Sequence, residues 1–186
     1  MDVIDTDLAD VKIFCPRRFE DDRGYFMETF AAHKYASAIG DMTFVQDNES
    51  FSRAPFTVRG LHYQAPPFAQ AKLVRAVKGT IFDVAVDVRS GSPSYGQWTG
   101  VELSADNGRQ LLVPAGFLHG FMTLEPDCLV AYKVTTRYDA ASDGAVHWAS
   151  PELGIEWPGA ADKVVLSEKD AAAPTFSAFA SPFDQS

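Results

Sequence analysis

A short run near position 60 gathers several side chains that could do chemistry. The run is VRGLHYQ, residues 58–64, which places Arg59 three residues before His62 and Gln64 two residues after it. Gln70 and Lys72 follow in QAKLVRAVKG. A histidine in such surroundings can be a metal ligand, an acid–base catalyst or a buried residue bonded to the backbone. The run by itself leaves these three interpretations open.

A second histidine tests the metal interpretation. His119 lies in VPAGFLHGF, residues 113–121, and this Pro-x-Gly-x-x-His pattern resembles the second motif of the cupins, small β-barrels of jelly-roll type. Metal-binding cupins also carry His-x-His in their first motif, whereas this chain has His62, Tyr63 and Gln64 at that place. A catalytic metal normally needs three or more protein ligands. His62 and His119 alone fall short of that number, so a metal site would need carboxylates from elsewhere in the chain.

The length and composition limit the classes of protein to which the chain can belong. With 186 residues, 46% of them hydrophobic, it suits a single domain, with a core expected over about 12–173 and a C-terminal tail over 174–186. The formal net charge of -9 argues against a nucleic-acid partner, which would need a basic face. A small anionic ligand stays possible, because a few gathered cations can bind phosphate.

The same survey predicts a cytoplasmic protein. There are two cysteines, Cys15 and Cys128, and no C-x-x-C pair. The N-terminus, MDVIDTDLADV, has neither the basic nor the apolar region of a signal peptide. No apolar run approaches the roughly 18 residues that would span a bilayer.

Turn residues and alternation predict an all-β fold. Residues 43–137 are rich in short strand-like runs, and the valines at 84, 86 and 88 alternate with residues 83, 85 and 87. Such runs at spacings of roughly 8 to 12 residues are typical of a sandwich or barrel. Helices are expected over 27–40, ending at Gly40, and over 166–174, with Ser167 as cap and Pro174 as stop. The tail is either an arm packed on a neighbour or a flexible end.

Nine pieces of the sequence then point to one family. FEDDRGYFMETF, FVQDNESFS, VRGLHYQ, QAKLVRAVKGTIFDVAVDVR, SPSYGQW, VPAGFLHGF, YKVTTRYD, SPELGIEWP and LSEKD occur in this order. Together they resemble the dTDP-4-dehydrorhamnose 3,5-epimerases, over about residues 12 to 173. The resemblance implies a cupin-type jelly-roll β-barrel with a few short helices. It implies a nucleotide-linked 4-keto-6-deoxy sugar as substrate, whose C3 and C5 protons flank the C4 ketone. It also implies that the enzyme uses no metal and no other cofactor.

Inverting such a centre needs a base, a group that stabilises the enolate and an acid on the opposite face. The resemblance assigns the base to His62, with Asp170 of LSEKD as its partner carboxylate, the enolate to Lys72, and the acid to Tyr132. Taken singly, these residues are more often a core histidine, a solvated lysine and a barrel-lining aromatic. The order of the motifs favours the catalytic interpretation.

Substrate binding is assigned in the same way. The resemblance gives the nucleotide and sugar to eight positions: Arg23, Phe26, Glu28, Gln46, Asn48, Arg59, His119 and Tyr138. Among them Arg59 is the predicted diphosphate clamp, because a guanidinium binds phosphate oxygens in a bidentate way. His119 is predicted to donate a hydrogen bond to the sugar. Asp83 and Asp87 are interpreted as structural, pairing with Arg75 or Arg89. The family also implies a homodimer.

Two alternatives stay open. An enzyme of the same mould could invert only C3 or only C5, within an antibiotic or surface-sugar pathway. From another class, a metal-dependent or non-enzymatic sugar-binding cupin is opposed by the missing His-x-His and by the filled catalytic positions. Metal analysis of the purified protein separates that class from the epimerases.

Overall fold

The structure is a computed structural model that describes residues 1–40, 42–159 and 161–184. Its elements, in chain order, are β1 (Asp2–Asp5), β2 (Lys12–Cys15), β3 (Arg18–Asp21), β4 (Gly24–Met27), α1 (Ala32–Ile39), β5 (Gln46–Ser52), β6 (Val58–Gln64), β7 (Lys72–Lys78), β8 (Thr80–Asp87), β9 (Arg89–Ser90), β10 (Trp98–Ser104), β11 (Gln110–Val113), β12 (Phe117–Thr123), β13 (Cys128–Val134), β14 (Asp143–Ala145), η1 (Ala161–Lys163), α2 (Glu168–Ala171), η2 (Phe176–Ala178) and β15 (Phe183–Asp184).

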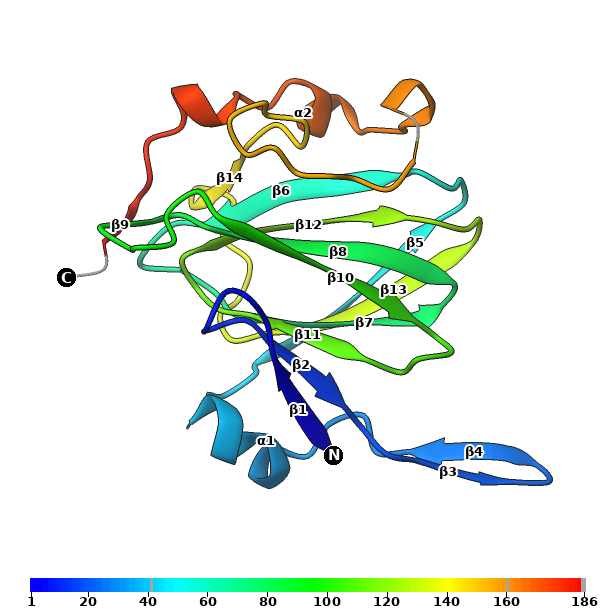
Figure 1. Cartoon of the computed structure of the whole chain (residues 1–186). Coiled ribbons are helices and arrows are strands. Elements are labelled where there is room, and N and C mark those ends of the chain that lie inside the picture. The colour runs from blue at the N-terminus through cyan, green and yellow to red at the C-terminus, as the bar shows by residue number, and fades with distance from the viewer. Residues whose placement is uncertain (41, 160, 185–186) are drawn as a thin grey trace.

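Two antiparallel sheets face each other and form the barrel (Figure 1). One sheet has the strand order β1-β2-β11-β7-β13-β5 and the other has the order β10-β8-β12-β6-β14. Alternate residues of each strand turn inward, and the apolar ones among them fill the space between the sheets, as Ile81, Ala85 and Leu103 do. The predicted all-β, cupin-type jelly roll with few helices is confirmed.

Each sheet also has a covered outer face. Helix α1 packs on the outside of the first sheet, against Phe14, Leu73 and Leu112. The valines at 84, 86 and 88 line the outside of the second sheet, where the C-terminal tail covers them. The alternation predicted around residues 83–88 is therefore present, but both faces of β8 are buried.

The C-terminal tail packs on its own chain. Phe183 is buried in the outer cluster of the second sheet, and β15 pairs in parallel with β9. The rings of Phe179 and Phe183 pack edge-on against Tyr63 of β6. Neither predicted state of the tail, an arm on a neighbour or a flexible end, describes residues 174–184.

The two predicted helices are shorter than expected. Helix α1 ends where predicted, with the Gly40 N–H bonded to the Ala36 carbonyl at 2.8 Å, but it begins at Ala32 and not at Met27. Met27 instead pairs with Arg18 in the β3–β4 hairpin, so pairing between strands overrides local helix propensity there. Helix α2 has the predicted Ser167 cap, whose hydroxyl accepts a hydrogen bond from the Asp170 N–H at 3.1 Å.

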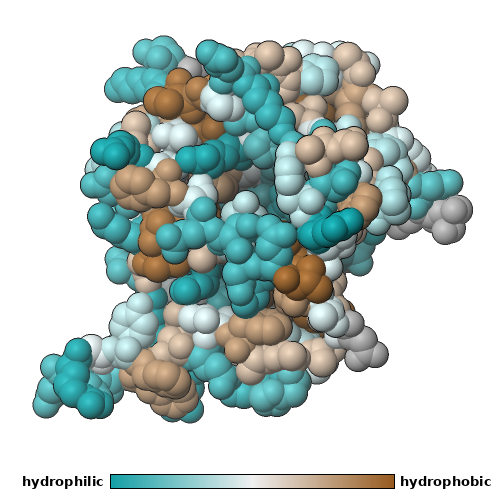
Figure 2. All heavy atoms as spheres, turned by 180° about the vertical axis from the view of Figure 1, so that it is seen from behind, coloured by the Kyte–Doolittle hydropathy of each residue, from teal (hydrophilic) through white to brown (hydrophobic). Residues whose placement is uncertain are grey.

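The β3–β4 hairpin projects from the body of the molecule (Figures 1 and 2). The tip of the hairpin is hydrophilic. The hairpin also carries three exposed aromatic side chains, Phe19, Tyr25 and Phe26. Within the described ranges, no helix is both long and apolar enough to cross a membrane.

Candidate active site

The space between the sheets opens into two adjoining cavities. The first measures about 590 Å³ and the second about 500 Å³. Four side chains, from β6, β7, β13 and α2, line both cavities and so mark the place where they meet: His62, Lys72, Tyr132 and Lys169. Three of these four are predicted catalytic residues. The fourth predicted one, Asp170, lines the first cavity.

His62 lies on β6, which approaches β12 closely at Gly60. Gly60, two residues earlier, has φ of 129°, and a Cβ there would lie 2.5 Å from the Gly120 Cα and 2.8 Å from the His119 carbonyl oxygen. Only glycine fits at this place. Within VRGLHYQ, the glycine at 60 therefore has a steric reason, and it lies between Arg59 and Leu61, two residues before His62.

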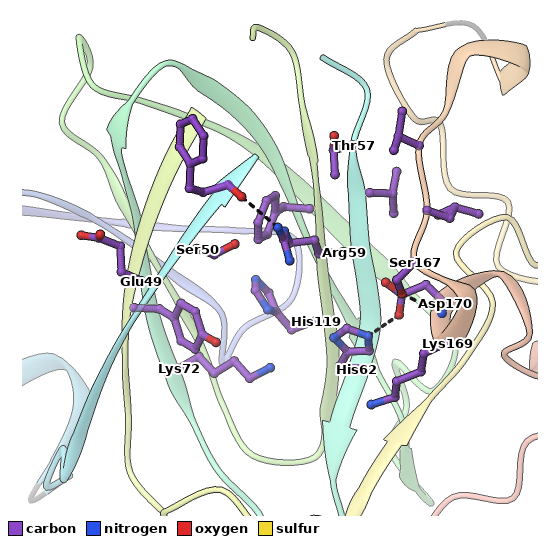
Figure 3. Close-up of a pocket in the computed structure, with 16 residues that line it drawn as sticks. Glu49, Ser50, Thr57, Arg59, His62, Lys72, His119, Ser167, Lys169 and Asp170 are labelled. Atoms are coloured by element: carbon purple, nitrogen blue, oxygen red, sulfur yellow. Dashed lines mark hydrogen bonds and ion pairs between the residues drawn. The ribbon is translucent and has the colours of Figure 1, made fainter. Parts of the chain in front are cut away.

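The contact expected between His62 and Asp170 is present, although 108 positions separate the two residues (Figure 3). The His62 Nε2 lies 2.6 Å from the Asp170 Oδ1. Burial acts to raise the pKa of Asp170, but hydrogen bonds from His62, Ser167 and the Gly60 backbone outweigh it and hold this pKa below its usual range. A carboxylate can only accept, so Nε2 donates and Nδ1 keeps the lone pair that a base needs.

Lys72 and Tyr132 come from the sheet opposite His62. They lie on neighbouring strands, where Lys72 is directly opposite Val134 and Tyr132 is opposite Val74. Burial lowers the pKa of Lys72 to about 8, while the charges of Asp83 and Asp143 act to raise it. Burial also raises the pKa of Tyr132, so its phenol stays protonated at neutral pH. The site thus holds an ammonium and a proton donor across the cavity from an imidazole.

Five of the eight predicted substrate-binding residues line one cavity or the other. Arg59 and His119 line the first. Arg59 is held by the Ser52 hydroxyl at 3.1 Å and the Phe51 carbonyl at 3.0 Å. Three others line the second cavity: Gln46, Asn48 and Tyr138. The Gln46 amide donates to the Asn48 Oδ1 at 2.8 Å, which orders both side chains at the cavity wall.

Arg23, Phe26 and Glu28 lie elsewhere. Arg23 and Phe26 are on or beside the projecting hairpin, and Glu28 follows it. Arg23 pairs with Asp21 and Glu28 with Lys34, each at 2.5 Å, and Phe26 is 69% exposed. Among the described residues, these three do not contribute to the walls of either cavity. One chain alone does not bring them to the site.

Sequence reasoning missed several polar residues of the site. Lys169 forms an ion pair with Asp143, which also accepts a hydrogen bond from the Tyr138 hydroxyl at 3.2 Å. This ion pair raises the pKa of Lys169. Lys169 directly precedes Asp170 in LSEKD, and this position could have indicated from the sequence that Lys169 belongs to the site. For Asp143 no signal was available, because only the pairing of β14 with β6 brings it to the cavity.

The interpretation of Asp83 needs correction. Its Oδ1 lies 2.7 Å from the His119 Nε2, and no arginine pairs with it among the described residues. Asp87 does pair with Arg89, at 2.7 Å, as one of the sequence alternatives has it. The difference follows from register, because β8 and β12 pair so that Asp83 lies opposite Phe121, two residues from His119.

Metal ligands are sparse in this arrangement. In the part of the chain that the structure describes, no three His, Cys, Asp or Glu side chains group so as to hold a metal ion. Cys15 and Cys128 are both free thiols.

A jelly roll whose cavity holds a paired histidine, an ammonium and a phenol has the groups that a proton-transferring isomerase requires. Comparison with known proteins identifies which one. Residues 5–178 match the family model of dTDP-4-dehydrorhamnose 3,5-epimerase, and the chain belongs to this family of epimerases. The dTDP-4-dehydrorhamnose 3,5-epimerase of Sinorhizobium fredii is 54% identical over 168 residues, which cover 90% of this chain and 86% of that protein.

Solved structures agree with the family assignment. The dTDP-6-deoxy-D-glucose-3,5-epimerase of Legionella pneumophila, in complex with dTDP-4-keto-L-rhamnose, has a TM-score of 0.92 and 44% identity, covering 96% of this chain and 94% of that one. A 3′-monoepimerase from Streptomyces bikiniensis, in complex with dTDP-quinovose, has a TM-score of 0.86 and 32% identity, covering 93% and 87%. The fold is therefore shared by double and single epimerases.

Proposed function

We propose that this enzyme inverts C3 and C5 of dTDP-4-dehydro-6-deoxy-D-glucose and so produces dTDP-4-dehydro-L-rhamnose. The observation that carries the proposal is the meeting of His62, Lys72 and Tyr132 where the two cavities join, with Asp170 bonded to His62. The adjoining cavities suit an extended ligand, with the sugar at the junction. The 54% and 44% identical relatives named above support the choice of substrate.

The proton transfers follow from where the groups stand. The C–H bond beside the ketone breaks, its proton goes to His62, and its electron pair moves to the ketone oxygen as an enolate. The Lys72 ammonium stabilises that oxyanion. Tyr132, on the opposite sheet from His62, then gives a proton to the other face of the carbon. Solvent restores both groups to their starting protonation, so no cofactor enters the balance.

The hairpin residues fit this proposal if a second copy of the chain completes each site. The hairpin that carries Arg23 and Phe26 projects from the body of the molecule, and its exposed aromatic side chains suit a protein contact. We therefore propose a homodimer in which each hairpin reaches the partner's cavity. A mixture of His62→Asn and Arg23→Ala proteins would regain activity, since one site of the mixed dimer is intact. No regain on subunit exchange would contradict this arrangement.

Two further properties belong to the proposal. The enzyme works in the cytoplasm, which its two free thiols support. It has no nucleic-acid partner, as its net charge of -9 indicates.

The deciding experiment is proton NMR of dTDP-4-keto-6-deoxyglucose with the enzyme in deuterated water. Deuterium entering at both C3 and C5 is the expected result. Deuterium at one carbon alone would replace the double epimerase by a single-centre one, the candidate that the 3′-monoepimerase from Streptomyces bikiniensis favours. No exchange at either carbon, together with stoichiometric bound metal, would support a metal-dependent cupin.

A further inference from the structure

Asp83 is a buried carboxylate that the proposed proton transfers do not use. Its side chain is 0% exposed, in the middle of β8. Its Oδ1 contacts His119, and its Oδ2 is one of the buried polar atoms that lack a partner in the described ranges. Burying a carboxylate costs free energy unless hydrogen bonds compensate. A fully buried carboxylate with a hydrogen-bond partner on only one oxygen therefore needs a functional explanation.

The contact with Asp83 sets which nitrogen of His119 carries a proton. A carboxylate can only accept, so His119 Nε2 donates to it. Burial lowers the pKa of His119, and the charges of Lys72 and His62 lower it further, while Asp83 acts to raise it. The imidazole is thus neutral near pH 7. A neutral imidazole with its proton on Nε2 has a lone pair on Nδ1.

His119 Nδ1 has no hydrogen-bond partner among the described residues and is not fully buried. Among those residues, the buried side-chain atoms that lack a partner are Arg18 Nε, Ser50 Oγ and Asp83 Oδ2. His119 lines the first cavity. With this tautomer, a ligand there would meet a hydrogen-bond acceptor in place of the donor expected from the sequence.

We infer that Asp83 is a positioning residue that holds His119 in the Nε2–H tautomer, so that His119 accepts a hydrogen bond from a hydroxyl of the bound sugar. The inference rests on the proposed function for the identity of that sugar. A 4-keto-6-deoxyhexose linked through C1 keeps hydroxyls at C2 and C3, whereas its ketone can only accept. Lys72 then contacts the ketone oxygen and His119 accepts a hydrogen bond from a hydroxyl, so the sugar has two separate polar contacts.

The tautomer can be measured directly on the wild-type enzyme. Nitrogen-15 NMR of protein labelled in its histidine rings distinguishes a protonated from an unprotonated ring nitrogen, and the signals missing in His119→Gln belong to His119. We expect a protonated Nε2 and an unprotonated Nδ1 over about pH 7 to 8, because the pKa of His119 is lowered from its usual value. A proton on Nδ1, or an imidazolium over that range, would overturn the inference. No substrate is needed, so this result is independent of the proposed function.

Two matched variants separate positioning from stability. Asp83 and Asp87 lie on the same strand and are both fully buried, but Asp87 bonds to Arg89, Ser92 and Ser94. In Asp83→Asn we expect His119 to lose its single tautomer and kcat/KM to fall about 10- to 100-fold. The basic limb of the pH profile should also move to lower pH, because the Asp83 charge that raises the Lys72 pKa is removed. Asp87→Asn should lower Tm alone. Identical behaviour of both would reduce Asp83 to a structural role.

Deoxy analogues identify the group that His119 binds. Deuterium exchange at C5 is followed with the 2-deoxy and 3-deoxy substrates, in wild type and in His119→Gln. For one analogue, the loss of exchange rate from the deoxy substrate and the loss from His119→Gln should not add, because both changes remove the same hydrogen bond. Fully additive losses with both analogues would contradict a hydroxyl contact. Absence of any exchange by the wild type would instead refute the proposed function and leave the tautomer result standing.

Discussion

The described residues form two histidine–aspartate pairs of nearly equal length, placed in different surroundings. His62 and Asp170 lie 2.6 Å apart, and the His62 side chain is 30% exposed. His119 and Asp83 lie 2.7 Å apart, with side chains 8% and 0% exposed. The first pair joins a strand to the short helix α2, and the second joins neighbouring strands of one sheet. Only the first can exchange protons readily with solvent.

This difference indicates how one residue pair can serve two purposes. A base that turns over must release its proton after each cycle, which requires contact with water. A group that holds a substrate in one orientation gains from a fixed, neutral and buried state. The pair with the partly exposed histidine suits proton transfer, and the fully buried pair suits recognition. Four predictions can break or sharpen that contrast.

The largest effect should come from the pair of His62 and Asp170. His62→Ala is expected to abolish exchange of the C5 proton with solvent deuterium, and Asp170→Asn to slow it about 10²- to 10⁴-fold by releasing the imidazole from its tautomer. Exchange is measured by NMR. Exchange near the wild-type rate in His62→Ala would exclude His62 as the base and remove the contrast.

The next effect concerns the acid across the cavity. Tyr132→Phe is expected to keep part of the C5 exchange, because His62 still removes the proton, but to lower product formation about 10²- to 10⁴-fold. Separate measurement of exchange and of inverted product decides it. Product formation unchanged in this variant would show that another group delivers the proton.

A smaller effect is expected from Lys72. The ammonium form is the active one, so kcat should fall as pH rises through about 8, the value to which burial lowers the Lys72 pKa. Lys72→Met should lower kcat about 10²- to 10³-fold and remove this basic limb. Lys78→Met, at the exposed end of the same strand, is the control. A basic limb that persists in Lys72→Met would assign it to a different group.

Removal of metal ions is expected to leave activity unchanged, which is the smallest of the four effects. The proposed proton transfers balance without a cofactor, so activity should survive prolonged dialysis against a strong chelator. The measurement is the C5 exchange rate before and after treatment, with metal analysis of the same sample. Activity lost to the chelator and restored by a divalent metal would contradict the cofactor-free mechanism.

Much of the chain follows from local sequence. Alternation around residues 83–88 predicts a strand, Gly40 predicts a helix end, and Ser167 predicts a helix cap, because each depends on the backbone preferences of a few neighbouring residues. The ordered motifs also predicted that His62, Lys72, Tyr132 and Asp170 act together, and all four line one cavity. Arg59 and His119 line the same cavity.

Other features were decided only by tertiary structure. Met27 belongs to a hairpin and not to a helix, because pairing with Arg18 outweighs its local propensity. The partners of Asp83 and Lys169 depend on strand register and on where α2 settles, and no spacing along the chain encodes either. A side chain's type sets which proton it can hold. Its partners, burial and accessible nitrogen are set by strands that the sequence keeps far apart.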